Sequence, residues 1–191
     1  ASDILLIAIT SKDIDAYERF IEQIEMSSIQ KVIFISSTSV YPVSNSLVTE
    51  ETTTMNTPLS AIENLFRDTT FFETTIIRFA GLFGPGRHPG SWFKNGKTIP
   101  QPNGFVNMIH LEDCIEIIHE ILDQDCWGTT FNACSNDHPS RRDFYTNARK
   151  SLNFENPIFE ENSQLKYKII SSKKLQEDLS YQFIHDNLLD I

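Results

Sequence analysis

Two stretches of strand length, one continuously apolar and one β-branched and aromatic, constrain the fold of this chain more than any other feature. They cover residues 4–9 (Ile-Leu-Leu-Ile-Ala-Ile) and 31–35 (Lys-Val-Ile-Phe-Ile). The continuous run at 4–9 is typical of a strand buried on both faces, as in a parallel sheet. Between them, apolar residues recur at helical spacing from Ile14 to Ile24, and Asp13 occupies the N-cap position. The pattern predicts a β-α-β unit with a right-handed crossover.

The same alternation of strand and helix patterns continues to the end of the chain. We expect further strands at 74–79, 106–109, 129–133 and 167–170, and helices at 58–70, 112–122, 140–152 and 171–175. Residues 42–57, which are rich in Ser, Thr and Asn, and the Gly/Pro-rich stretch 81–104 are predicted to be loops. The sequence shows no repeat and no linker, so we predict a single α/β domain over residues 1–191.

Composition restricts the function classes. The 191 residues are 40% hydrophobic, enough for a sizeable core, and the formal net charge of −10 disfavours binding to nucleic acid. No apolar run approaches the ~20 residues of a membrane-spanning helix, so no membrane partner is expected. The three cysteines include no CxxC pair, which indicates reduced thiols in a cytoplasmic protein and no zinc knuckle.

The strand at 31–35 ends in a hydroxyl-rich turn, Ser36-Ser37-Thr38-Ser39-Val40-Tyr41. Ligands of parallel α/β sheets bind beyond the carboxyl ends of the strands, so hydroxyls placed there face a site. Ser37 is therefore a candidate for hydrogen bonding to a small-molecule substrate. The alternative is a strand-end serine that caps the local backbone.

Several motifs follow this turn in a characteristic order. They are Arg78-Phe79-Ala80-Gly81-Leu82-Phe83-Gly84-Pro85-Gly86-Arg87, then Asn107-Met108-Ile109-His110-Leu111-Glu112-Asp113, Phe131-Asn132-Ala133 and Pro139-Ser140-Arg141-Arg142-Asp143-Phe144-Tyr145. Together with the serine turn they resemble the extended short-chain dehydrogenases, the NAD-dependent epimerase/dehydratase family. The resemblance implies a Rossmann-like parallel sheet with a small C-terminal α+β substrate lobe, formed mainly by residues 82–110 and 134–191.

The resemblance also implies a set of site residues. Ser37 takes the position of the catalytic serine, while Arg87 and Asn107 become substrate ligands. The cofactor would be NAD or NADP. The residues that would contact it are Ala8, Ile9, Thr10, Ser36, Phe79, Ala80 and Gly81.

The Gly-rich turn that cradles the cofactor pyrophosphate in this family does not occur in the sequence. The first strand, residues 4–9, resembles the family's fourth strand. The resemblance thus implies that a nucleotide-binding half precedes residue 1, and NAD(P) binding is expected only where that half is present. Without it, residues 4–9 would expose an apolar sheet edge, which we expect a second copy or a partner chain to cover.

The Tyr-x-x-x-Lys pair of the family is also replaced. Counting through the helix that starts at Pro58 puts Ser60 at the Tyr position and Asn64 at the Lys position. A Ser hydroxyl is a much weaker acid than a phenol, whose reference pKa is ~10 and which a nearby ammonium lowers further. Asn64 carries no charge, and the neighbouring Glu63 would raise rather than lower the pKa of an acid beside it.

Three functions remain open on the sequence. The first is an atypical NAD(P)-dependent nucleotide-sugar epimerase/dehydratase-like protein that acts on a small polar or sugar-derived substrate. The second is a catalytically inactive dinucleotide-binding or scaffold protein of the same fold, because Ser60 and Asn64 replace the Tyr/Lys pair. The third is a fragment that binds no cofactor and is stabilised by a partner.

Four other polar or aromatic residues have simpler interpretations. We expect Arg78 to pair with a carboxylate and Tyr41 to pack in the core. His110 and Asp113 are expected to form a structural helix start, because the sequence supplies no third ligand at metal-binding spacing. No metal site is therefore predicted.

Overall fold

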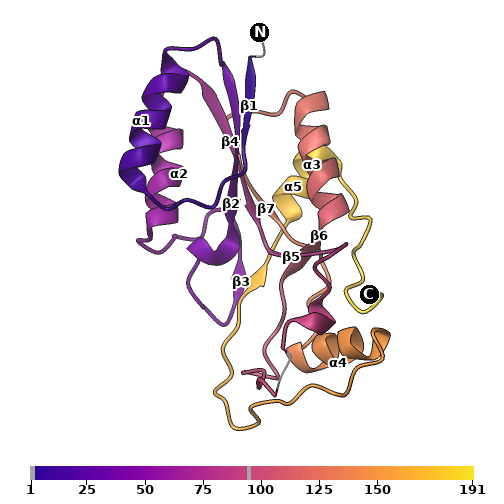
Figure 1. Cartoon of the computed structure of the whole chain (residues 1–191). Coiled ribbons are helices and arrows are strands. Elements are labelled where there is room, and N and C mark those ends of the chain that lie inside the picture. Colours follow the sequence, from indigo (N-terminus) through magenta and orange to yellow (C-terminus); the bar gives the residue numbers. More distant parts are fainter. Residues whose placement is uncertain (1–2, 94–95) are drawn as a thin grey trace.

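The computed structural model describes residues 3–93 and 96–191 and is built around one parallel sheet. Its strands are β1 (Ile4–Ile7), β2 (Lys31–Ser37), β4 (Glu73–Phe79) and β7 (Thr130–Ala133), in the order β1-β2-β4-β7 (Figure 1). Ser37 lies in register with Phe79, and Phe79 with Ala133, so three strands end at one edge. The predicted Rossmann-like α/β class is confirmed.

One face of this sheet is covered by α1 (Ile14–Glu25) and α2 (Pro58–Asp68), which lie side by side in Figure 1. The aromatic rings of Phe34 and Phe66 stack there at 4.8 Å between centroids, and Tyr17 packs edge-on against both. The predicted N-cap of α1 is confirmed, because the Asp13 carboxylate accepts a hydrogen bond from Ala16 N at 3.0 Å.

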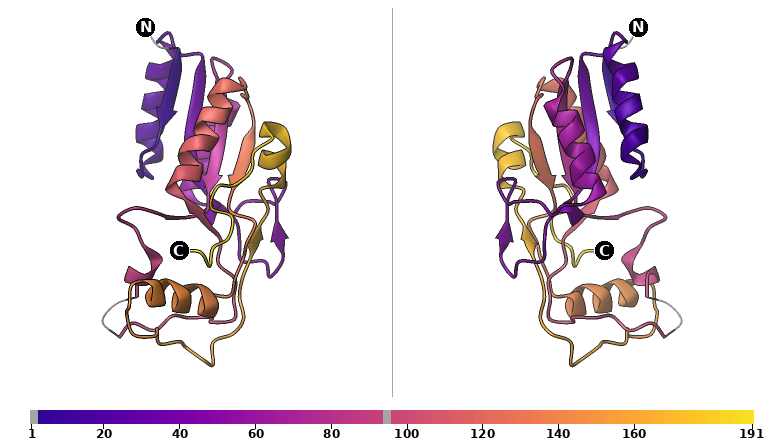
Figure 2. Two further views of the ribbon diagram at one scale, coloured as in Figure 1. Left: turned by 90° about the vertical axis from the view of Figure 1, so that its right-hand side faces the viewer. Right: turned by 90° about the vertical axis from the view of Figure 1, so that its left-hand side faces the viewer.

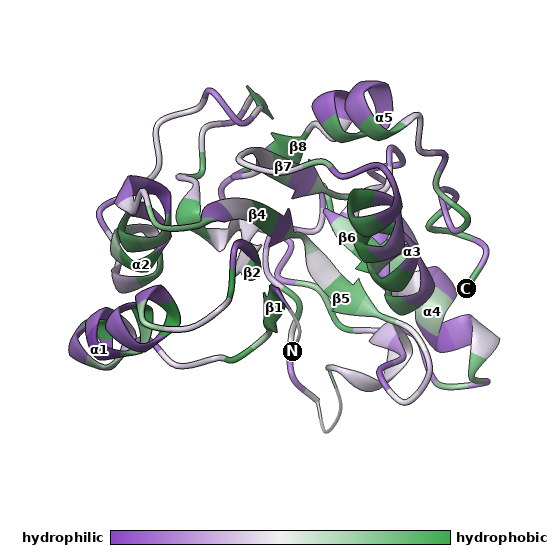
Figure 3. Ribbon diagram, turned by 90° about the horizontal axis from the view of Figure 1, so that it is seen from above, coloured by the Kyte–Doolittle hydropathy of each residue, from purple (hydrophilic) through white to green (hydrophobic). Residues whose placement is uncertain are grey.

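The opposite face is covered by α3 (Leu111–Asp123), while α5 (Lys173–Leu179) packs near β7 (Figure 2). Seen from above in Figure 3, the sheet lies between α1 and α2 on one side and α3 on the other. Ile117 and Ile121 of α3 are fully buried in the core cluster that includes Ile77 and Phe131. Among residues 3–93 and 96–191, no helix has the length and apolar character needed to cross a membrane.

The first strand, β1, lies at an edge of the sheet and pairs with β2. Leu6 is 48% exposed and Ile9, just beyond the strand, is 55% exposed. The apolar edge expected from the sequence is thus open in this chain.

A smaller lobe lies below the sheet in Figure 1 and contains α4 (Arg141–Ser151) and the 3-10 turn η2 (Pro89–Ser91). Two parallel strands, β5 (Gly81–Phe83) and β6 (Met108–His110), connect it to the sheet region. Its core includes Phe83, Met108 and Phe144.

Several predicted boundaries of strands and loops differ from the observed ones. β1 ends at Ile7, two residues before the predicted end, since its register with β2 stops there. The predicted loop 81–104 begins with β5, and residues 94 and 95 of it lie outside the described part. The predicted loop 42–57 contains β3 (Leu47–Val48), which pairs with β8 (Ile169–Ile170). A two-residue strand has no local periodicity, so a pattern search misses it.

The contact between η2 and α4 depends on Gly90. A Cβ atom at this position would lie 2.2 Å from the backbone oxygen of Ala148. We expect Gly90→Ala to lower the free energy of unfolding by about 1–3 kcal/mol through overpacking, measured by urea denaturation. Ser91→Ala adds no atom beside the same helix and is the control, so equal unfolding midpoints for both variants would contradict this packing.

Candidate functional site

Ser37 lies at the carboxyl end of β2, where the sequence placed the site. Its Oγ accepts a hydrogen bond from Ser39 N at 3.1 Å and thereby caps the 3-10 turn η1 (Thr38–Val40). The capping alternative is therefore realised in the structure. A hydroxyl that accepts in this way can still donate its own O–H, so capping leaves Ser37 able to contact a ligand.

Lys168, which the sequence reasoning did not single out, holds the same turn from the other side. Its ammonium donates to the backbone oxygens of Thr38 and Tyr41, both at 2.8 Å. Burial lowers the pKa of Lys168. The only signal in the sequence was a charged residue within the strand-like segment 167–170, and nothing in that segment indicates its partner.

The residues expected to contact the dinucleotide separate into two groups. Ala8, Ile9, Thr10 and Gly81 are exposed, at the carboxyl ends of β1 and β4. The others are buried: Phe79 and Ala80 belong to the core under α3, and Ser36 donates from Oγ to Glu63 Oε1 at 2.5 Å on the α2 side. The structure brings the first group to the edge where Ser37 lies and directs the Ser36 side chain away from it.

The two expected substrate ligands also differ in their surroundings. Arg87 is exposed on the loop after β5, where its Nε donates to Leu82 O at 2.8 Å and its guanidinium lies 5.7 Å from the centre of the Trp92 ring. The side chain of Asn107 donates to Lys168 O and accepts from Ile170 N. Asn107 thus holds the segment that carries Lys168.

The positions that correspond to the Tyr/Lys pair are engaged in helix structure. Ser60 forms a capping box with Thr57 at the start of α2, and its Oγ donates to Met55 O at 2.6 Å. Ser60 is 6% exposed, whereas Asn64 is exposed and accepts from Arg67. Neither a serine hydroxyl held in a helix cap nor an asparagine amide is an acid comparable to the phenol of the Tyr/Lys pair.

Glu63 and Arg78 form a buried ion pair next to β2. Glu63 is 1% exposed and Arg78 is 4% exposed, and Arg78 Nε lies 3.0 Å from Glu63 Oε1. Burial alone would lower the pKa of Arg78, but its hydrogen bonds to Glu63 and the charge of that carboxylate raise it above the usual value. The predicted pairing of Arg78 with a carboxylate is confirmed. Both carboxylate oxygens of Glu63 accept hydrogen bonds from Arg78.

Tyr41 extends the buried polar network. Its hydroxyl accepts from Arg78 Nη1 and donates to Asn132 Oδ1 at 2.8 Å. Tyr41 is 1% exposed, and burial raises the pKa of its phenol. A phenol in this state is a packed structural group, as expected, and not a substitute for the missing acid.

His110 caps α3, as expected, by accepting from Glu112 N through Nδ1 at 3.2 Å. The fold adds a neighbour that spacing did not reveal. His185 Nε2 lies 2.7 Å from Glu112 Oε2, and potential ligand atoms of His110, Glu112 and His185 lie within 4.8 Å of one another. The capping bond occupies His110 Nδ1 and the positive end of the helix dipole disfavours a cation, so we assign no metal to this cluster.

Known proteins resemble this chain in sequence and in fold. No family model matches it. It is 34% identical over 176 residues to Protein YeeZ of Escherichia coli (strain K12), and the match covers 89% of this chain and 64% of that protein. The chain thus spans less than two thirds of the length of its curated relative.

Two of the solved structures that share the fold show how far the similarity extends. A functionally unknown conserved protein from Silicibacter pomeroyi DSS superimposes with a TM-score of 0.82 at 21% identity, over 97% of this chain and 74% of that one. UDP-glucuronic acid 4-epimerase from Bacillus cereus, solved with NAD, gives a TM-score of 0.76 at 17% identity, over 98% and 71%. The chain therefore shares the Rossmann-like fold of these two proteins.

Proposed function

We propose that this chain is the sheet and substrate lobe of an NAD(P)-dependent epimerase/dehydratase-like protein that acts on a small polar or sugar-derived substrate. The observation that carries the proposal is the alignment of strand ends at one edge of the sheet. Ser37 of β2 is in register there with Phe79 at the end of β4, and Phe79 is in register with Ala133 at the end of β7. Ligands of open parallel sheets bind at this edge, and the similar epimerase is solved with NAD.

In this proposal the exposed backbone of residues 8–10 and Gly81 lies against the dinucleotide. Ser37 donates a hydrogen bond to a substrate oxygen, and the turn that carries it is held by Lys168. Arg87, on its exposed loop, supplies a cation for a carboxylate or phosphate of the substrate. The free edge of β1 is covered by further strands or by a partner chain, such as a second copy.

A second candidate is a member of the same fold that binds a dinucleotide without catalysing redox chemistry. The observation that favours it is the structural use of Ser60, whose hydroxyl is buried in the cap of α2. Adding UDP-glucuronic acid to the NAD⁺ complex distinguishes the two. An epimerase-like enzyme oxidises a substrate alcohol to a ketone, so that the C–H hydride passes to NAD⁺ and the hydroxyl proton passes to solvent. The reduced nicotinamide absorbs in the near ultraviolet, whereas a binding protein leaves the cofactor oxidised.

Thr10→Glu tests the cofactor edge. We expect the whole protein, as its gene encodes it, to bind NAD⁺ or NADP⁺ in calorimetric titration. Thr10→Glu should weaken this binding about ten-fold or more, because the added carboxylate would repel the phosphates of a dinucleotide bound at this edge. Gln23→Glu adds the same charge on the exposed side of α1 and should leave the Kd unchanged.

Binding that is insensitive to Thr10→Glu would place the dinucleotide elsewhere. If neither NAD⁺ nor NADP⁺ binds, both candidate functions are rejected. The third function would then be favoured, a chain that binds no cofactor and is stabilised by a partner.

A further inference from the structure

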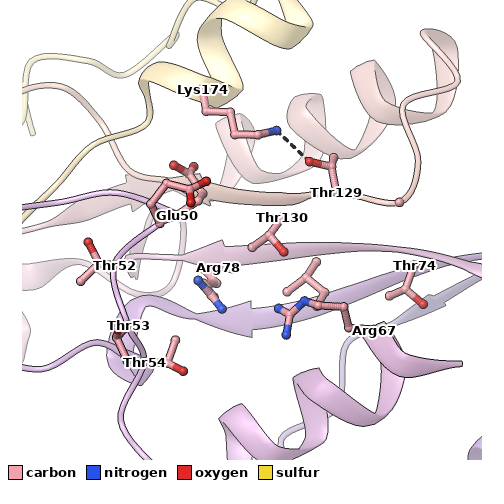
Figure 4. A pocket seen from close by; sticks show the side chains of 13 residues that line it. Glu50, Thr52, Thr53, Thr54, Arg67, Thr74, Arg78, Thr129, Thr130 and Lys174 are labelled. Carbon is pink, nitrogen blue, oxygen red and sulfur yellow. Dashed lines mark hydrogen bonds between the residues drawn. The ribbon is translucent and has the colours of Figure 1, made fainter.

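A polar cavity of about 490 Å³ lies on the α2 side of the sheet, between α2, α5 and strands β4 and β7 (Figure 4). Ser36 points toward α2, where it contacts Glu63. Successive residues of a strand point to opposite faces, so Ser37 points away from the cavity. The cavity is therefore separate from the edge proposed above for the dinucleotide.

The cavity wall is polar where a sheet face is normally apolar. Of the β4 residues that line it, Thr74 and Arg78 are polar, and β7 begins with Thr130. Three cations reach the cavity from different elements: Arg67 from α2, Arg78 from β4 and Lys174 from α5. Figure 4 shows the guanidinium groups of Arg67 and Arg78 near each other in the middle of the view, with Lys174 approaching from the opposite side.

Two buried polar groups lack a partner, and one of them lies on the cavity wall. Thr74, which lines the cavity, is 9% exposed, and its Oγ1 has no hydrogen-bond partner among the described residues. The same holds for Nδ2 of the fully buried Asn132, whose backbone N–H donates to Glu50 on the cavity wall. Asn132 is in register with Arg78, four residues beyond Thr74 on β4, so the two groups would need separate acceptors. Of the two, the Thr74 hydroxyl is on the cavity wall and can donate to an acceptor bound there. Leaving them unpaired costs stability.

We propose that this cavity binds a small hydroxylated oxyanion, a sugar phosphate or a sugar acid. Arg67 and Lys174 would pair with the phosphate or carboxylate, since guanidinium and ammonium groups form strong charge-assisted hydrogen bonds to either. The hydroxyl groups of such a molecule match the threonine hydroxyls and Glu50 on the wall. Burial raises the pKa of Glu50 and so favours its neutral form relative to an exposed glutamate.

Lys174→Gln is the test, with the neighbouring Lys173→Gln as its matched control. Both lysines are on α5 and both pair with an acid four residues on, but Lys173 does not line the cavity. Glucose 6-phosphate and gluconate should bind the wild-type protein in calorimetric titration and raise its Tm, whereas glucose should not. Lys174→Gln should weaken both about ten-fold, and Lys173→Gln should not.

Thr74→Val gives an independent readout. Without ligand it should raise the Tm, because it removes an unpaired buried hydroxyl at nearly constant volume, and it should weaken binding of both anions. A lower Tm would show that the hydroxyl is satisfied within the protein and would count against the site.

Three outcomes would overturn the proposal. One is that neither anion binds the wild-type protein. Another is that the two lysine substitutions weaken binding equally. The third is that Arg87→Gln, at the other site, abolishes binding while Lys174→Gln does not. None of these outcomes depends on whether the protein binds NAD(P).

Discussion

Glu63→Ala is expected to lower the free energy of unfolding by about 3–5 kcal/mol, because it leaves the Arg78 guanidinium buried without a counter-charge. Arg78 is 4% exposed, and the same carboxylate also accepts from Ser36. The loss would appear as a lower urea midpoint with native secondary structure before the transition. A protein that accumulates only in inclusion bodies would be the extreme form of the same effect.

Arg67→Ala is the control, because it removes a charge that contacts Glu63 without leaving another charge buried and unpaired. Arg67 also contacts Glu63, at 3.5 Å, but its side chain is 42% exposed. Glu63 stays paired with Arg78 when the largely solvated Arg67 is removed, so Arg67→Ala should lower stability by only about 0–1 kcal/mol. The double variant Glu63→Leu/Arg78→Met removes both buried charges and should be more stable than Glu63→Ala. Equal losses for Glu63→Ala and Arg67→Ala would contradict the buried pair.

Asp113→Ala is expected to release the C-terminal segment from α3, at a cost of about 2–4 kcal/mol. The carboxylate of Asp113 is fully buried and accepts from Tyr181 Oη at 2.8 Å, Ile184 N at 2.7 Å and His185 N at 3.2 Å. Hydrogen exchange should become faster at residues 181–188, while the amides of β2 and β4 keep their protection relative to global unfolding.

The control for Asp113 is Asp186→Ala in the same segment. Asp186 accepts from Asn136 through exposed atoms, so its loss should cost about 1 kcal/mol or less. If Asp113→Ala leaves exchange at residues 181–188 unchanged, the segment is held by its apolar contacts and not by this carboxylate.

The strands of the central sheet and the helices that pack on it were predictable, because apolar runs, helical spacing and capping residues are local features of the sequence. The apolar run 31–35 became β2, and the helical spacing from Ile14 to Ile24 became α1 with the expected Asp13 cap. The short strands β3 and β8 were not predicted as a pair, because their register depends on residues more than a hundred positions apart.

The candidate site was predictable in part. The position of Ser37 at a strand end followed from the sequence, as did the absence of an acid at residues 60 and 64. The role of Glu63 did not, because only the fold shows that it faces Arg78 and not residue 60. Lys168 was missed because its partners, the oxygens of Thr38 and Tyr41, are far away in sequence.

The sequence by itself determined the α/β class, the serine turn at the end of β2 and the replacement of the Tyr/Lys pair. Periodicity, capping and residue identity act over a few positions, so they can be read without knowing the fold. Only the tertiary structure decided which polar groups meet. It closed the serine turn with Lys168, buried Glu63 against Arg78 and brought Arg67, Thr74 and Lys174 around one cavity. Each of these contacts joins separate elements, and the side-chain directions that make them depend on sheet register and helix packing.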